Sequence, residues 1–173
     1  IPAWDGEAVM VVEAREARVS ASLLDIASGA ETPVRLADDN LLPVGGLPDG
    51  DWIGMRFHST FPTEMVRFSP REPARMLNLS HAQQRSSLKP ADFTPAEDFR
   101  WRSVDGLPIQ GWLYRTRRPA RGTLIWVHGG PTYHSEDEVN TLIQYLAAQG
   151  FNVLDPNYRG STGYGDAFLR EMA

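Results

Sequence analysis

Two glycine-rich turns near the end of the 173-residue sequence carry the residue types that could do chemistry. His128-Gly129-Gly130-Pro131 directly follows Thr123–Val127, an apolar run that predicts a strand buried on both faces. Glycines allow positive φ and leave backbone N–H groups uncovered. Two such N–H groups at a strand's carboxyl end can stabilise a developing oxyanion, which acyl transfer requires. A tight turn without a ligand, or a phosphate-binding loop, would fit the same residues. The sequence contains neither Gly-Lys-Ser/Thr nor G-x-G-x-x-G.

The other polar residues near these turns are expected to be structural. His128 is expected to pack at the strand end, and His134 to lie on a surface loop. Ser135, followed by three acids, predicts an N-terminal helix cap, and this stretch matches no strong metal-ligand spacing. Ser161 is not expected to be a nucleophile, because it lies in Gly-Ser-Thr-Gly rather than Gly-x-Ser-x-Gly. An ion pair of Arg159 is expected to hold its loop. The sequence therefore predicts no catalytic triad, no metal site and no cofactor.

The elements that position these turns form a β-α-β unit. Apolar residues recur at helical spacing after residue 140, and Gly150 is expected to end that helix. Phe151–Leu154 predicts the second buried strand. Upstream, Glu97–Ser103 and Ile109–Arg115 predict a hairpin around the Asp105-Gly106 turn.

The first half of the chain predicts short strands separated by turns. The expected strands are Ala8–Glu13, Arg18–Ile26, Thr32–Leu36, Trp52–Phe57, Glu64–Phe68 and Arg75–Leu79. The residues Ala27-Ser28-Gly29 predict a hairpin turn. The two sets of strands align at an offset of about 42–44 residues, which is typical of β-propeller blades. An antiparallel meander is the alternative. Residues 80–96 are polar, contain two prolines and predict a linker.

Composition limits the class of protein and its partners. A hydrophobic content of 42% and a charged content of 23% are ordinary for a globular protein. A net charge of −5 without a basic cluster argues against nucleic-acid binding. No apolar run is long enough to span a membrane. The absence of cysteine favours a reducing compartment, the cytoplasm, with the periplasm as the alternative. Both ends of the sequence look cut, so we expect a fragment of a longer polypeptide, called the parent below.

Together the motifs resemble the prolyl oligopeptidase family of serine peptidases, most closely its acylaminoacyl-peptidase and dipeptidyl-peptidase-like branch. The residues that carry the resemblance are WVHGGPTYHSEDEVN (126–140), PNYRGSTGYGDAF (156–168) and DGLPIQGWLYR (105–115). The resemblance implies β-propeller blades (all-β) followed by the N-terminal part of an α/β-hydrolase domain. Its expected boundaries are 1–85 for the blades, 86–96 for a linker and 97–173 for the hydrolase part.

The resemblance also implies roles for individual residues. The backbone N–H of Gly130 would be half of the oxyanion hole, and Gly129 would shape the turn. Tyr133 and Arg159 would border the substrate cleft. The triad would lie after residue 173, so the parent is expected to be a peptidase and this chain alone inactive. The partners implied are a peptide or acyl-peptide substrate and the remainder of the hydrolase domain.

Two other hypotheses stay open at this point. An esterase or lipase-like hydrolase would share the glycine turn, although the repeats upstream count against it. A non-catalytic assembly fragment would use an unpaired strand edge for self-association as a homo-oligomer.

Overall fold

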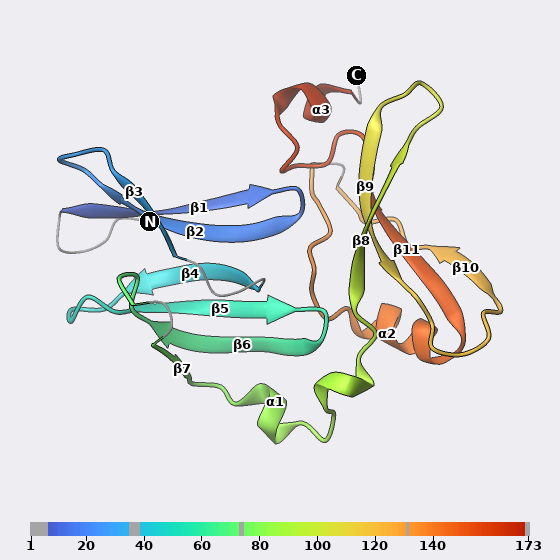
Figure 1. Cartoon of the computed structure of the whole chain (residues 1–173), viewed down its shortest axis with the longest axis horizontal. Coiled ribbons are helices and arrows are strands. Elements are labelled where there is room, and N and C mark those ends of the chain that lie inside the picture. Colours follow the sequence, from blue (N-terminus) through green and yellow to red (C-terminus); the bar gives the residue numbers. More distant parts are fainter. Residues whose placement is uncertain (1–6, 35–38, 73–74, 131, 172–173) are drawn as a thin grey trace. The chain divides into compact units, whose positions relative to one another are not determined.

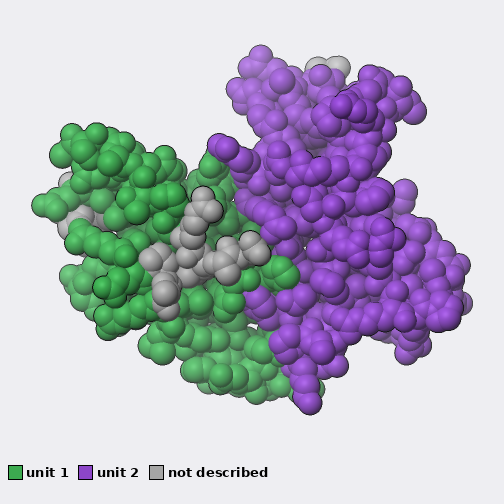
Figure 2. All heavy atoms as spheres, in the orientation of Figure 1, with its two compact units in different colours: residues 1–14, 19–58, 62–87 green, residues 15–18, 59–61, 88–173 purple. Residues whose placement is uncertain are grey.

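The computed structural model describes residues 7–34, 39–72, 75–130 and 132–171. The chain divides into two compact units (Figure 2). Unit 1 comprises residues 1–14, 19–58 and 62–87, and unit 2 comprises residues 15–18, 59–61 and 88–173. Two short segments from the first half of the sequence therefore belong to unit 2.

Unit 1 contains two antiparallel sheets (Figure 1). The strands of the first are β1 (Ala8–Arg15), β2 (Arg18–Asp25) and β3 (Glu31–Val34), in that order. The predicted turn lies between β2 and β3, where Gly29 has a φ of 70°. The predicted third strand was to reach residue 36, and residues 35 and 36 lie outside the described residues.

The second sheet is a four-stranded meander. Its strands, in spatial order, are β4 (Asn40–Gly46), β5 (Trp52–His58), β6 (Phe61–Phe68) and β7 (Met76–Asn78). The strand β4 is not among the predicted ones, because Pro43 and two glycines do not predict a strand. The structure accommodates them at a register shift between Pro43 and Gly45. Four short strands in sequence order are the arrangement of a propeller blade.

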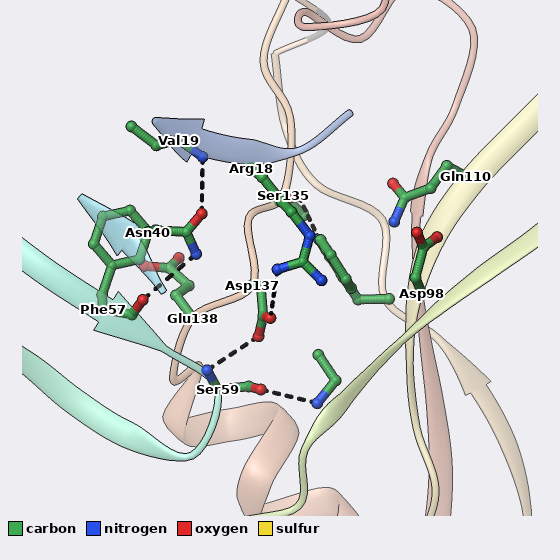
Figure 3. A network of polar contacts seen from close by, with 12 residues as sticks. Arg18, Val19, Asn40, Phe57, Ser59, Asp98, Gln110, Ser135, Asp137 and Glu138 are labelled. Carbon is green, nitrogen blue, oxygen red and sulfur yellow. Dashed lines mark hydrogen bonds and ion pairs between the residues drawn. The ribbon is translucent and has the colours of Figure 1, made fainter. Parts of the chain in front are cut away.

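One apolar core joins the two sheets of unit 1. Its buried members are Ala8, Met10, Ala21, Val34, Leu41, Trp52, Val66 and Phe68. A buried amide also links the sheets, since Asn40 accepts a hydrogen bond from the backbone N–H of Val19 at 2.8 Å (Figure 3). The segment predicted as a linker contains two short helices, α1 (Ala82–Arg85) and η1 (Pro90–Asp92).

Unit 2 is built on a mixed sheet with the spatial order β10-β11-β9-β8. The hairpin strands are β8 (Ala96–Arg102) and β9 (Pro108–Tyr114), and the parallel pair is β10 (Gly122–Ile125) and β11 (Phe151–Asn157). The predicted hairpin and β-α-β unit are both present. Gly111 is required in β9, because a Cβ there would lie 2.7 Å from the carbonyl oxygen of Asp155. The core around α2 contains Ala17, Trp112, Tyr114, Ile143 and Val153.

The prediction that Thr123–Val127 is buried on both faces is wrong. The strand ends at Ile125, whose exposed fraction is 65%, and Val127 is 63% exposed. The reason lies in the sheet order, because β10 lies at the edge of the described sheet and pairs there with β11 only. An apolar run cannot by itself distinguish a covered strand from an uncovered one.

The predicted cap of the helix is also wrong. The helix α2 (Thr141–Ala148) begins six residues after Ser135, and Asn140 is its N-cap residue. The Asn140 side chain accepts hydrogen bonds from the N–H groups of Leu142 (3.1 Å) and Ile143 (3.2 Å). The expected end at Gly150 is confirmed by its φ of 94°.

We expect Asn140→Ala to lower the free energy of unfolding by about 1 kcal/mol, because two helix N–H groups lose their acceptor. Urea denaturation measures this value. Thr141→Ala, at the next and exposed position, is the control and should change stability by less than about 0.5 kcal/mol. Equal effects of the two substitutions would contradict the capping role.

Candidate active site

The glycine turn after β10 lies at the carboxyl end of the parallel strands, where α/β sheets bind ligands. Gly130 has a φ of 137°, and a Cβ there would lie 3.0 Å from the backbone nitrogen of Thr132. Gly129 has open space around its Cα. Within the described residues, the N–H of neither glycine donates a backbone hydrogen bond. The turn therefore presents donors for an acceptor that the described residues do not supply. Pro131 lies outside the described residues.

His128 fixes the start of this turn, as the sequence analysis expected. Its buried ring stacks on Tyr158, with ring centroids 4.4 Å apart and planes 17° from parallel. The Tyr158 hydroxyl donates a hydrogen bond to the His128 carbonyl oxygen at 2.8 Å. The strand-end histidine is therefore a packing group that joins the two glycine-rich turns.

Ser161 lies beside His128 but does not have the geometry of an activated nucleophile. Its side chain is fully buried, and its hydroxyl donates to the Tyr158 carbonyl oxygen at 2.6 Å. The His128 Nε2 atom lies 3.1 Å from Ser161 Oγ, and the Nδ1 atom of the same ring lies 2.9 Å from the Gly129 carbonyl oxygen, so the ring connects Ser161 to the glycine turn. This pair holds the loop in place.

The residues after the turn are tied to the second glycine-rich loop. The Tyr133 carbonyl oxygen accepts a hydrogen bond from the Thr162 N–H at 3.1 Å, and His134 Nδ1 lies 2.6 Å from Thr162 Oγ1. The expectation that His134 is a surface residue is wrong, because these contacts bury it. The Tyr133 side chain is 52% exposed.

Arg159 forms the expected ion pair. Its guanidinium lies 2.5 Å from an Asp105 carboxylate oxygen and 3.3 Å from Ser103 Oγ. Hydrogen bonding from Arg159 lowers the pKa of Asp105 below its usual value. The pair holds the β8–β9 turn, and a role for Arg159 in bordering the cleft stays a prediction.

A pocket of about 230 Å³ lies next to the turn, and the sequence analysis did not find it. Its lining is acidic and aromatic and consists of Tyr114, Trp126, His128, Gly129, Tyr133, Ser135, Glu136, Glu138, Asn140 and Asp155. Asp155 is only 4% exposed and accepts a hydrogen bond from Ser135 Oγ at 2.8 Å. Burial raises the pKa of Asp155 to about 7, and the nearby Glu138 carboxylate adds to this increase. Burial also raises the pKa of Glu138.

Ser135 therefore lines this pocket and does not cap the helix. Its N–H donates to Asn157 Oδ1 at 2.7 Å, and its carbonyl oxygen accepts from the indole N–H of Trp112 at 2.8 Å. The only signal in the sequence was an acid, Asp155, that directly follows an apolar run. Within the described ranges, no group of three or more His, Asp and Glu side chains is placed to hold a metal ion.

Comparison with known proteins shows which family the chain resembles. Residues 137–173 match the model of the prolyl oligopeptidase family (Peptidase_S9). The resemblance to this family is confirmed over these residues. Over 121 residues it is 29% identical to the uncharacterized peptidase YuxL of Bacillus subtilis (strain 168), which covers 60% of this chain and 18% of that protein. It is also 33% identical over 97 residues to acylamino-acid-releasing enzyme 2 of Oryza sativa subsp. japonica, covering 54% of this chain and 12% of the relative.

Solved structures share the fold of this chain. A Pyrococcus horikoshii acylaminoacyl peptidase superposes with a TM-score of 0.76 at 22% identity, covering 96% of this chain and 26% of that chain. A Mycobacterium tuberculosis puromycin-hydrolyzing peptidase gives a TM-score of 0.76 at 20% identity, again covering 96% and 26%. The expected fold class is confirmed: propeller-blade sheets are followed by the N-terminal part of an α/β-hydrolase domain.

The chain spans less than a fifth of the length of these two curated relatives. Within the described residues, no helix is both long enough and apolar enough to cross a membrane.

Proposed function

We propose that the chain is part of a serine peptidase that hydrolyses short peptides or N-acylated peptides through an acyl-enzyme. In this proposal residues 1–85 are the last propeller blades, 86–96 are the linker and 97–173 begin the hydrolase domain. The observation that carries the proposal is the turn at the carboxyl end of β10, where the N–H groups of Gly129 and Gly130 donate no backbone hydrogen bond within the described residues. The family match supports it. The absence of cysteine supports a cytoplasmic location.

The proposed chemistry gives Gly130 a role in charge stabilisation. When a serine hydroxyl attacks the substrate carbonyl carbon, its proton passes to a general base and the carbonyl oxygen becomes an oxyanion. A backbone N–H aimed at that oxygen strengthens its hydrogen bond as the charge develops. The N–H of Gly130 is one such donor, and the parent would supply the second donor and the triad. Tyr133 and Arg159 would border the cleft for the peptide.

The chain by itself is proposed to be inactive. Ser161 is buried and its hydroxyl proton is bound to the Tyr158 carbonyl oxygen, so a substrate carbonyl carbon has no approach to it. The His128 ring lies between Ser161 Oγ, 3.1 Å from Nε2, and the Gly129 carbonyl oxygen, 2.9 Å from Nδ1, where it packs the two turns together. The nucleophile, the base and the orienting acid would come from the remainder of the parent.

We expect a fluorophosphonate probe to label the parent once per polypeptide, and to leave this 173-residue chain unlabelled, because the probe reacts only with an activated serine. Intact mass spectrometry of both proteins measures the labelling. Stoichiometric labelling of the chain at Ser161 would contradict the buried-serine argument. A parent that is unlabelled and has no hydrolase activity would overturn the proposed function.

The two alternatives predict different results for the same proteins. An esterase would cleave a p-nitrophenyl ester and leave an N-acetylated peptide amide intact. An assembly fragment would show no hydrolysis and would self-associate through β10, whose outer edge has no strand partner in the described sheet.

A further inference from the structure

A buried carboxylate lies just after the proposed oxyanion turn and is held by residues distant in the sequence. Asp137 is 1% exposed. Its carboxylate accepts a hydrogen bond from the Ser59 N–H at 3.1 Å and lies 3.4 Å from the Arg18 guanidinium (Figure 3). We call Arg18, Ser59 and Asp137 the Asp137 cluster; all three belong to unit 2. Such a charge is stable in an apolar interior only if partners compensate it.

Ser59 is itself fixed on both sides. Its hydroxyl oxygen accepts a hydrogen bond from the Ala96 N–H at 2.9 Å, at the first residue of β8 (Figure 3). Its carbonyl oxygen accepts from Gln144 of α2 at 3.2 Å. The partner that binds Asp137 is therefore anchored to the sheet and to the helix of unit 2.

Arg18 holds the same segment by a second route. Its guanidinium lies 5.1 Å from the centre of the Trp112 ring, in cation–π contact. The indole N–H of that ring donates to the Ser135 carbonyl oxygen at 2.8 Å. One arginine thus contacts both the carboxylate of Asp137 and the ring that fixes the backbone two residues earlier.

The turn before Arg18 has a strained backbone conformation. Glu16 and Ala17 have φ values of 49° and 59°, which side chains other than glycine adopt with strain of about 1–3 kcal/mol each. Tertiary contacts hold the turn there. The Glu16 N–H donates to the Gly163 carbonyl oxygen at 2.9 Å, and Ala17 is fully buried in the core of unit 2.

We propose that Asp137 is a positioning residue for the glycine turn, acting through Arg18 and Ser59. The backbone at Gly130 packs closely against Tyr133, since a Cβ on Gly130 would lie 3.2 Å from Tyr133 Cβ. A shift of Asp137 therefore moves Ser135 and Tyr133, and with them the backbone N–H of Gly130. This inference rests on the proposed function for its effect on catalysis, but the positioning itself can be measured without catalysis.

The test uses amide hydrogen exchange of Ser135 in the 173-residue chain, because no substitution below touches the Ser135 N–H or its acceptor, Asn157. Asp137→Asn and Arg18→Met should each accelerate this exchange at least tenfold. Because both substitutions remove the same ion pair, the effect of the double variant should be smaller than the sum of the two single effects. Arg18→Lys, which keeps the charge, should restore exchange to within about threefold of the original chain.

The control is Asp49→Asn, which also removes one negative charge but changes an exposed acid of unit 1 that pairs with Arg67 on the surface. It should leave the exchange rate unchanged. If Asp137→Asn does not fold, the exchange rate of Arg18→Met alone tests the proposal. The Arg18 side chain is 45% exposed, so its removal is tolerated more readily. Unchanged exchange in Arg18→Met, or additive effects in the double variant, would overturn the proposal.

In the parent, the same Arg18→Met substitution should lower kcat at least tenfold and leave KM within about twofold, because misplacing a catalytic donor affects the transition state more than binding. Accelerated exchange in a parent that has no hydrolase activity would support the positioning and overturn the proposed function. Normal kcat together with unchanged exchange would overturn the positioning and leave the proposed function standing.

Discussion

Gly130→Ala in the parent is expected to lower kcat/KM for an N-acetylated peptide by about 10²–10³-fold, the usual loss when one oxyanion donor is removed. The backbone at Gly130 has a φ of 137°, which an L side chain rarely adopts. The new Cβ would also lie 3.0 Å from the Thr132 nitrogen and 3.2 Å from Tyr133 Cβ. The turn must therefore change its conformation, and the N–H at position 130 changes direction with it.

Gly129→Ala is the matched control, because a Cβ at Gly129 meets no atom within 4 Å and no positive φ requires glycine there. We expect less than about a fivefold change in kcat/KM. The pair also tests the expected turn-shaping role of Gly129, which stays a prediction. Equal losses for the two variants would indicate a general effect on folding. Full activity of Gly130→Ala would remove Gly130 from the oxyanion hole.

The local elements were largely predictable from the sequence. The β8–β9 hairpin followed from alternation around Asp105-Gly106, and the β-α-β unit followed from two apolar runs separated by a helical pattern. The predictions were wrong or incomplete where the structure depends on residues that are neighbours in space and distant in the sequence. Pro43 does not predict a strand, yet a register shift lets β4 join its sheet. The exposure of β10 depends on its place at the sheet edge, which an apolar run of five residues does not reveal.

The candidate site was predictable only where one turn contains the whole motif. Gly130 could be identified because its role depends on backbone geometry within a few residues. The position of Ser135 could not, because it is set by Asn157 and Trp112, each more than 20 residues away. The Asp137 cluster was even less predictable, because Arg18 and Asp137 are 119 residues apart in the sequence. A single sequence carries no signal for such pairs.

Asp155→Asn is expected to stabilise the chain strongly above neutral pH. Burial raises the pKa of Asp155 from 3.8 to about 7 in the folded state. At a pH between these two pKa values, the Asp155 carboxyl group is protonated in the folded state and has already lost its proton in the unfolded state. Stability therefore falls as the pH rises through this window and does not fall further above about pH 7. The whole loss is on the order of 4 kcal/mol, at 1.36 kcal/mol for each pKa unit.

The asparagine variant removes this dependence and keeps an oxygen to accept the hydrogen bond from Ser135. Its amide N–H₂ group lies in the same buried place and costs roughly 1 kcal/mol. The expected gain is therefore on the order of 3 kcal/mol at pH 8. At pH 4, where Asp155 of the folded chain is protonated, the variant should gain nothing. Urea denaturation of both chains between pH 4 and pH 8.5 measures the difference.

Glu97→Gln is the control for the loss of one negative charge, since Glu97 is half-exposed and pairs with Arg115 on the surface. It should change stability by less than about 1 kcal/mol, with no step between pH 4 and pH 7. A variant at position 155 that is no more stable than the original chain at pH 8 would mean that the pocket solvates or compensates the Asp155 carboxylate. In that case the pocket beside Gly129 tolerates a full negative charge, and an ammonium or guanidinium group of the parent or of its substrate becomes its expected counter-ion.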